Sequence, residues 1–530
     1  MLRILEFLCY CSTVGQFSQV CHQLLIQFFG EIVGKVGAYL LRRSKRPLRD
    51  IVASTSLKEN EVKKAVAILV QHNFVVFEPG ENNVNIAEYS VVSENIYCLL
   101  RYPKYLFMMK NLFGDESEVL LEELLNQGQD SASNLIFRSV QRLREVLEEN
   151  QVSSVSPLLL YEKLQNMAYK KYIIRLPQLA NVNSKEIPTL VTEEDLKFTC
   201  PTLDLGLMSQ RLQDNSDPLG NYSDSHIMWR VNFEKFNHDM RKEILVNAAA
   251  RRIDPLAGQL YHLLYNLWTD NSQPESPISN ALTYNQIRDA VSKSFESTSP
   301  LVLYCDQYLK ILAEHSPNLI TKNGDAGGGQ YILNKTNVFT NMACATLDSI
   351  VLEKFGSKAT RLFRLTRSKN YLEHGQMQQL SMIPTKDTST LSYHLLEHNF
   401  LQLKELRKGT SNAAPVKCFF LFYVDLPQVS MLQLDLAYKG LHNALVRQQY
   451  ELTVNARLLE KQQRAETMMA TFRDQGATEE EIEESCSISP SDKTLLAKVH
   501  NMSDKLTLGQ MQVDETILIL DTYLKFTRMK

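Results

Sequence analysis

The sequence predicts a mainly α protein with small β wings, an α+β fold of tandem winged-helix domains followed by a C-terminal antiparallel coiled-coil hairpin. Three observations lead to this prediction. Helical runs precede short β-rich runs in an order that repeats along the chain. Two C-terminal stretches carry apolar residues at seven-residue steps. With 530 residues, of which 44% are hydrophobic and 22% charged, the chain has the composition of about three or four globular domains.

The first module begins with a long amphipathic helix. Apolar residues recur at three- and four-residue steps from Val20 to Leu41, which places them on one helical face. Pro47 opens a short second helix, and Ser56 with Glu59 has the spacing of an N-cap that starts a third helix. Two β-rich runs around a Pro-Gly turn then predict a hairpin. This is the order of a winged helix, whose third helix enters the major groove in DNA-binding members.

The same order recurs and predicts four related modules. The second copy has an extra leading helix and a poorly defined wing. A stretch rich in Asn, Ser, Asp and Pro separates it from the third copy, and its apolar residues follow neither the helical nor the strand period. We expect an N-terminal extension at 1–18, winged helices at 19–92 and 93–176, a flexible linker at 177–228, winged helices at 229–335 and 336–426, and the coiled-coil hairpin at 427–530.

The C-terminal hairpin is predicted from two heptad series, Met431 to Leu459 and Val499 to Leu520. An acidic segment poor in apolar residues separates them, so we expect two long antiparallel helices, the first from about 428 to 472. An arm of this length exceeds what its own folding requires, so part of its apolar seam is expected to face a partner chain. The candidate interface residues are Leu445, Leu452, Leu459, Val499, Leu506, Val513 and Leu520.

Positive charge is local in this chain. A formal net charge of −3 and a pI near 6.4 exclude a globally basic nucleic-acid coat. The densest positive run flanks the third helix of the first module, where cations could bind phosphate without reading sequence; a solvated helix end explains the same residues. These DNA-contact candidates are Arg42, Arg43, Lys45, Arg46, Arg49, Lys63 and Lys64.

A second basic group steps by about three residues along a helix of the fourth module. Such a stripe fits an acidic protein partner as well as it fits DNA, and either contact would give affinity with little specificity. The group consists of Lys358, Arg361, Arg364, Arg367 and Lys369.

We find no catalytic, cofactor or metal site in the sequence, and no small-molecule substrate is implied. His394, Glu397 and His398 spell H-x-x-E-H, but the segment belongs to a predicted winged-helix core helix and no further ligand is apparent. The glycines between Gly324 and Gly329 lack the Lys-Ser or Lys-Thr that completes a phosphate loop, so a wing tip with positive φ explains them better.

The compartment can be judged from the cysteines and the N-terminus. Nine scattered cysteines without a CxxC pair indicate a reducing environment. The segment from Met1 to Tyr10 has the outline of a signal peptide, but Glu6 interrupts it, so an intracellular helix or an extension is favoured. Without a run of about 18 uncharged apolar residues, no membrane contact is expected.

Several segments together resemble one known family. They are Phe28–Leu40, Lys63–Phe74, Arg101–Tyr105, Val119–Leu125, Gly324–Leu333, Phe355–Leu365, Met382–Lys386, Arg457–Gln462 and Val513–Leu520. In these segments the chain resembles the winged-helix subunit of the RNA polymerase III peripheral heterotrimer, which is related to the larger subunit of general transcription factor IIE. Residues 1–18 and the segment 177–225 have no counterpart in the resemblance.

The resemblance implies four extended winged helices and a coiled-coil hairpin. It also implies a nuclear, non-catalytic subunit that sits with two heterotrimer partners on the clamp of the largest polymerase subunit and assists promoter opening at small untranslated RNA genes. Its contact with promoter DNA would be non-specific. The alternative is a free-standing winged-helix regulator, which should carry base-reading Arg, Asn and Gln side chains on a basic third helix.

Overall fold

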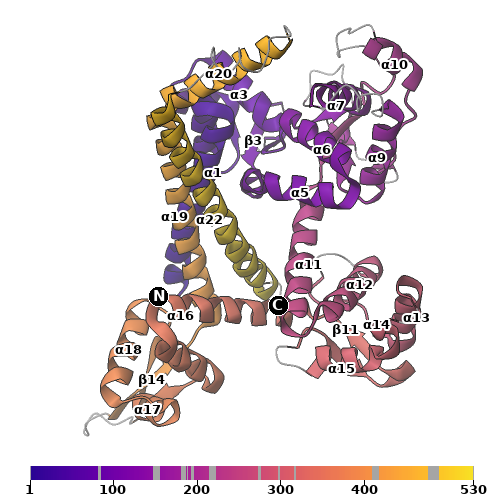
Figure 1. Cartoon of the computed structure of the whole chain (residues 1–530). Helices are drawn as coiled ribbons and strands as arrows, with labels where there is room; N and C mark the ends of the chain where they lie inside the picture. Colours follow the sequence, from indigo (N-terminus) through magenta and orange to yellow (C-terminus); the bar gives the residue numbers. More distant parts are fainter. Residues whose placement is uncertain are drawn as a thin grey trace. The chain divides into compact units, whose positions relative to one another are not determined.

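The computed structural model is mainly helical, with small antiparallel sheets (Figure 1). It describes residues 2–528 except 81–84, 147–155, 181–186, 188, 192–195, 214–221, 273–275, 297–298, 315–317, 409–416 and 475–488. The chain divides into two compact units. One contains Met1–Thr13, Asp239–Gly440 and Gln512–Lys530, and the other contains Val14–His238 and Leu441–Met511.

The first winged helix has the predicted order of elements. It consists of α1 (Leu2–Arg42), β1 (Arg46–Pro47), α2 (Leu48–Thr55), α3 (Glu59–Gln71), β2 (Val75–Pro79) and β3 (Ala87–Val91), with β3 central in the sheet β1-β3-β2. The expected boundary at residue 18 does not interrupt the helix, since α1 runs through it and changes direction only at Gly30, where φ is 85°.

The predicted N-cap of the third helix was wrong by two residues. Ser56 instead ends α2, in the left-handed conformation with φ 55°, and α3 begins at Glu59 after Lys58. A left-handed residue stops a helix because its backbone cannot continue the right-handed turn. Glu59 and Glu61 in the first turn then stabilise the positive end of the α3 dipole.

The second winged helix is closed by a strand that the sequence pattern assigned elsewhere. Its elements are α4 (Ser93–Tyr97), η1 (Cys98–Arg101), α5 (Tyr102–Phe113), α6 (Asp115–Gln127), β4 (Asp130–Ser131), α7 (Ala132–Val146), α9 (Pro157–Tyr169), β5 (Ile173–Arg175) and β8 (Met228–Val231). Trp229 on β8 pairs with Asp130 on β4 and with Arg175 on β5. The predicted division between 228 and 229 therefore cuts through this sheet, and the wing looked poor because its second strand lies far downstream.

The segment predicted as a flexible linker, 177–228, is an insertion of the second module and is partly folded. It contains the two-stranded sheet of β6 (Gln178–Ala180) and β7 (Thr189–Val191), and helix α10 (Leu205–Gln213). Met208 is buried, the Tyr161 hydroxyl donates to the Pro201 carbonyl at 2.9 Å, and Asp224 accepts from the Ser133 amide at 2.8 Å. The segment has too few apolar residues to show a helical or strand period, so its sequence does not predict these contacts.

The third winged helix begins at α11 and ends in the predicted glycine wing. Its elements are α11 (Phe233–Arg252), α12 (Pro255–Asn271), β9 (Leu282–Thr283), α13 (Tyr284–Ser294), α14 (Pro300–Leu303), α15 (Cys305–Glu314), β10 (Thr321–Gly324), η3 (Ala326–Gly328) and β11 (Gln330–Ile332). Gly327, Gly328 and Gly329 have φ of 64°, 85° and 120°. The expectation that the tip needs positive φ is confirmed.

The fourth winged helix is led by a helix of 35 residues. Its elements are α16 (Lys335–Lys369), β12 (Leu372–Glu373), α17 (His374–Ser381), α18 (Thr385–Glu397), β13 (Gln402–Lys408) and β14 (Lys417–Tyr423). α17, α18 and β14 lie together in Figure 1, around a core that includes Phe363, Leu395 and Phe400. The segment between β13 and β14 lies outside the described residues.

The C-terminal helices form the predicted antiparallel hairpin. Its first arm is two helices, α19 (Leu426–Val454) and α20 (Ala456–Asp474), and its second arm is α22 (Pro490–Arg528). Gln448 donates to the hydroxyls of Ser503 and Thr507 at 3.3 and 3.2 Å, and Lys461 pairs with Asp492 at 2.6 Å. The contacts of Gln448 and Lys461 run in opposite directions along the two arms, as antiparallel helices require. The acidic segment between the arms lies outside the described residues.

Candidate nucleic-acid and protein interfaces

All seven DNA-contact candidates lie on the first winged helix. Arg42 ends α1, Arg43 and Lys45 lie between α1 and β1, Arg46 begins β1, Arg49 lies on α2, and Lys63 and Lys64 lie on α3. Three of them are held by local carboxylates, since Lys45 pairs with Glu78, Arg46 with Asp50 at 3.8 Å and Lys63 with Glu59 at 2.7 Å. These exposed pairs contribute little to stability and would weaken any contact with phosphate.

The other four cations are exposed. Arg42, Arg43, Arg49 and Lys64 have no ion-pair partner within the part of the chain that the structure describes. The α3 helix itself carries two glutamates and two lysines, so its own charges balance. The positive charge therefore comes mainly from Arg42 and Arg43, at and just beyond the end of α1, and from Arg49 on α2, whose neighbour Asp50 pairs with Arg46. This arrangement suits contact with a phosphate backbone better than base reading by α3.

The corresponding helices of the third and fourth winged helices expose apolar side chains. Leu303 is 66% exposed and Tyr304 51% exposed beside α15, while Tyr393 on α18 is 61% exposed. Leu309 on α15 points the other way and is buried in the core. Large exposed apolar side chains at these positions suit contact with another protein.

The heptad seam of the hairpin is only partly available to a partner. Leu445 and Leu520 are 2% and 0% exposed, so the chain's own residues cover them and their expected role in a partner interface was wrong. Leu452 is 38% exposed, and Leu459 is half-buried. The half-buried remainder of the candidate seam is Val499, Leu506 and Val513. Gln23 on α1 donates a hydrogen bond to Gln449, one turn from Leu445, so α1 lies against this part of the seam.

The H-x-x-E-H residues do not converge on a shared point. His394 and Glu397 are exposed side chains 3.5 Å apart, while His398 ends α18 and its ring lies 5.2 Å from that of Phe355. Among the residues that the structure describes, no group of three or more His, Cys, Asp or Glu side chains could hold a metal ion. The three residues lie at the C-terminal end of α18, and their positions there explain the spacing of the motif without a metal ion.

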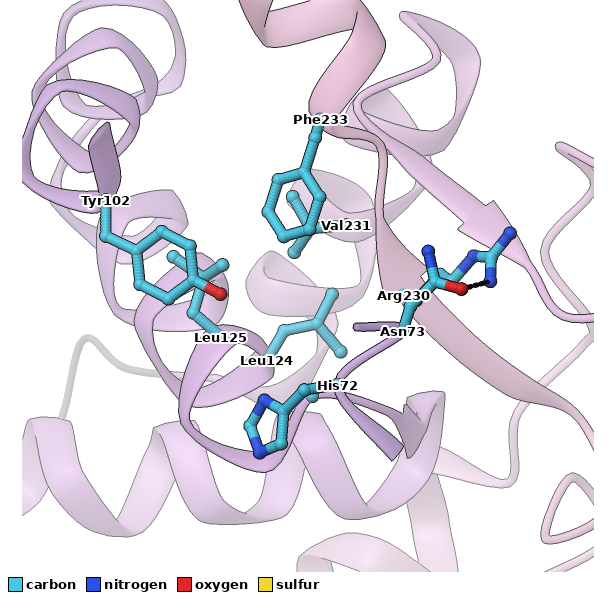
Figure 2. Close-up of a pocket in the computed structure, with 9 residues that line it drawn as sticks. His72, Asn73, Tyr102, Leu124, Leu125, Arg230, Val231 and Phe233 are labelled. Atoms are coloured by element: carbon cyan, nitrogen blue, oxygen red, sulfur yellow. Dashed lines mark hydrogen bonds between the residues drawn. The ribbon is translucent and has the colours of Figure 1, made fainter. Parts of the chain in front are cut away.

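The joint between the first two winged helices encloses a very small cavity (Figure 2). Figure 2 shows Tyr102, Leu124 and Phe233 around it, with Arg230 and Asn73 at one side; the Arg230 guanidinium donates to the Asn73 side-chain carbonyl at 2.8 Å. The cavity measures about 10 Å³, room for at most one water molecule. We therefore interpret it as a packed joint rather than a ligand site.

Burial has a strong electrostatic effect at this joint. It lowers the pKa of His72 from 6.5 to about 4, and it also lowers the pKa of Arg230. The His72 ring lies 4.8 Å from that of Phe29 and 5.7 Å from that of Phe74, so aromatic surface replaces water around it. Sequence reasoning missed His72 and Arg230 because neither lies in a motif.

One described helix, Gly15–Arg42 within α1, is long and apolar enough to cross a membrane, with a mean hydropathy of 1.5. The core helix of a globular domain has the same length and composition. The side chains on this helix that are buried in the folded chain include Val20, Leu24, Leu25 and Val36. Its apolar character is thus explained by packing.

Four family models match successive parts of the chain. They are the RNA polymerase III subunit RPC82 helix-turn-helix domain at 19–79, RNA polymerase III subunit RPC82 at 162–342, the POLR3C C-terminal winged-helix domain at 347–424, and the helical hairpin domain of DNA-directed RNA polymerase III subunit RPC3 at 457–519. They follow the order of the first, second and third, and fourth winged helices and the hairpin.

Curated relatives align over nearly the whole chain. DNA-directed RNA polymerase III subunit RPC3 of Mus musculus is 32% identical, with 96% of this chain and 98% of the relative aligned. The Danio rerio protein of the same name is 30% identical, with 97% and 99% aligned. The Dictyostelium discoideum relative is 24% identical over 45% of this chain and 37% of its own.

Proposed function

Because the chain belongs to the family of RNA polymerase III subunit RPC3, we propose that it is a non-catalytic subunit of RNA polymerase III that acts in transcription initiation. The observation that carries this proposal is the alignment of 98% of a relative of that name with the whole order of four winged helices and a hairpin. A chain that shared only one winged helix with the family could have a quite different partner.

Within this proposal the subunit joins two partners in a heterotrimer on the clamp of the largest polymerase subunit and assists promoter opening at small untranslated RNA genes in the nucleus. The exposed apolar side chains of the third and fourth winged helices support a role in protein contacts. The balanced charge of α3 argues against the alternative, a free-standing regulator that reads bases through a basic third helix.

Affinity purification of the tagged full chain from nuclear extract, followed by mass spectrometry, tests the assignment. Recovery of the largest polymerase III subunit together with two small subunits in equal amounts supports it. A protein recovered alone, or bound to promoter fragments in the absence of polymerase subunits, contradicts it and favours the regulator.

We propose that the exposed cations of the first winged helix contact promoter DNA once the subunit is assembled. Replacing Arg42, Arg43 and Arg49 by Ala should flatten the slope of log affinity against log salt by up to about three for polymerase bound to promoter DNA, because each neutralised phosphate releases about 0.9 counterion. The measurement is a salt titration of promoter binding by reconstituted polymerase.

The matched control replaces three exposed cations of the fourth winged helix that lie outside its basic stripe, Lys354, Lys386 and Lys404, by Ala. It should leave the slope near the wild-type value. Equal slopes for the first-module variant and the wild type would show that these arginines do not contact DNA and are only solvated side chains at a helix end. Loss of polymerase assembly in that variant would instead assign them to a subunit interface.

We also propose that the exposed part of the hairpin seam docks the subunit onto a partner. Leu452→Asp should lower the recovery of polymerase subunits at least about tenfold, since an unpaired charge in an apolar interface costs several kcal/mol. Leu445→Asp, one heptad earlier and 2% exposed, should instead destabilise the folded chain. Co-purification followed by thermal unfolding separates these effects, and a folded Leu452→Asp variant with full recovery contradicts the docking role.

A further inference from the structure

A groove of about 430 Å³ lies along the second half of α16, the leading helix of the fourth winged helix. Its lining combines two arginines with two leucines and three hydroxyl side chains. These residues are Leu352, Ser357, Thr360, Arg361, Arg364, Leu365 and Ser368. No carboxylate is among them, so the groove combines positive charge with an apolar surface.

The shape of α16 creates this groove. Gly356 has φ 81° and interrupts the helix, which brings Asp348 of the first half against the arginines of the second half. Asp348 is 6% exposed. Its carboxylate accepts from Arg364 Nε at 2.8 Å and from two nitrogens of Arg367 at 2.8 and 3.1 Å. Charge-assisted bonds of this kind fix the position of a guanidinium group.

Asp348 fixes the position of Arg364 but binds only part of its guanidinium group. Its side chain is 61% exposed, and only its Nε takes part in the bond to Asp348. The two terminal nitrogens of its guanidinium group make no hydrogen bond to the residues that the structure describes, so they can bind a ligand in the groove. Arg361 lies one turn earlier on the same side of the helix, is exposed, and has no ion-pair partner within the described ranges. The groove therefore contains two neighbouring positive charges, and Asp348 fixes the position of one of them, Arg364.

We propose that this groove binds a short segment of a protein partner in which acidic side chains flank an aliphatic one. A planar guanidinium group matches a carboxylate with two parallel hydrogen bonds. Leu352, which is 48% exposed, and the half-buried Leu365 would cover the aliphatic side chain. A phosphate group has no aliphatic part for these leucines to cover, so the lining favours a peptide over a phosphate ligand.

The interaction goes beyond the proposed place of the chain in the polymerase and can be tested on the purified full-length protein. The probe is a fluorescein-labelled peptide with an Asp-Leu-Asp core between glycine-serine flanks, and fluorescence anisotropy measures its binding. Arg361→Ala should weaken binding about tenfold or more, because a hydrogen bond between charged groups is lost. Arg364→Lys, which keeps the charge but not the planar fork, should weaken it as well.

Lys369→Ala is the matched control, since it removes an exposed cation from the same helix outside the groove. Wild-type affinity for this variant, with weaker binding by the two arginine variants, supports the proposal. It is overturned by equal losses in all three variants, by equal binding of a peptide with serine in place of aspartate, or by no saturable binding up to about 1 mM. Displacement of the peptide by a DNA duplex that itself depends on Arg361 would assign the groove to nucleic acid and also overturn it.

Discussion

Trp229→Ala should destabilise the second winged helix by about 3–5 kcal/mol, the range for removing a large aromatic side chain from a core. Trp229 is 0% exposed and lies on the central strand of the sheet β4-β8-β5, where its neighbours across the sheet are Asp130 and Arg175. Truncation would leave a cavity beneath the strand that closes the module. Hydrogen exchange should then become faster at the amides of Ile173–Arg175 and Met228–Val231.

The matched control is Trp268→Ala, which removes the same side chain from α12 of the third winged helix, where Trp268 is 1% exposed. It should accelerate exchange in the third module and leave the amides of β5 and β8 protected. If Trp229→Ala loosened the third module and left the second intact, β8 would belong to the third module, as its position in the sequence had indicated.

Stability should fall as pH is lowered from about 6.5 towards about 4, and His72 should account for a large share of that loss. Burial lowers the pKa of His72 to about 4 in the folded chain, whereas the unfolded chain binds this proton near pH 6.5. Between these values the unfolded state holds more protons, so acid favours unfolding. A pKa lowered from 6.5 to about 4 corresponds to a loss of about 3 kcal/mol once the proton is bound in the unfolded state and not yet in the folded one.

His72→Gln removes the titrating group, so its stability should depend less on pH than that of the wild type. Urea unfolding at about pH 8 measures the loss of packing alone, because His72 is neutral there in both states. The difference between wild type and variant should shrink by about 2 kcal/mol between pH 8 and pH 5. A constant difference across this range would show that His72 is not buried in its neutral form.

Local sequence determined the type and order of most elements. The helical period of α1, the heptads of α19 and α22, and the glycines of the third wing were all readable, because each follows from the geometry of a helix or a turn. The resemblance to an RNA polymerase III subunit was readable for a related reason. Its matching segments lie mostly on these regular elements.

The candidate interfaces were less predictable. The sequence indicated the basic groups and the heptad seam, but it did not indicate which of their residues are free to contact DNA or a partner chain. Three of the seven DNA-contact candidates have carboxylate partners, and Leu445 is covered by its own chain. Burial and ion pairing depend on residues far away in the sequence, so periodicity alone cannot separate Leu445 from Leu452.

What the sequence determined by itself is the family, the winged-helix order and the hairpin, since these are encoded in residues close to one another along the chain. Only the tertiary structure decided that β8 closes the second module across a long insertion, that His72 is held neutral in a joint, and that Asp348 fixes Arg364 beside a groove. The physical reason is the same in each case. Strand pairing, desolvation and the bonding of a buried carboxylate depend on residues that folding brings together from distant positions.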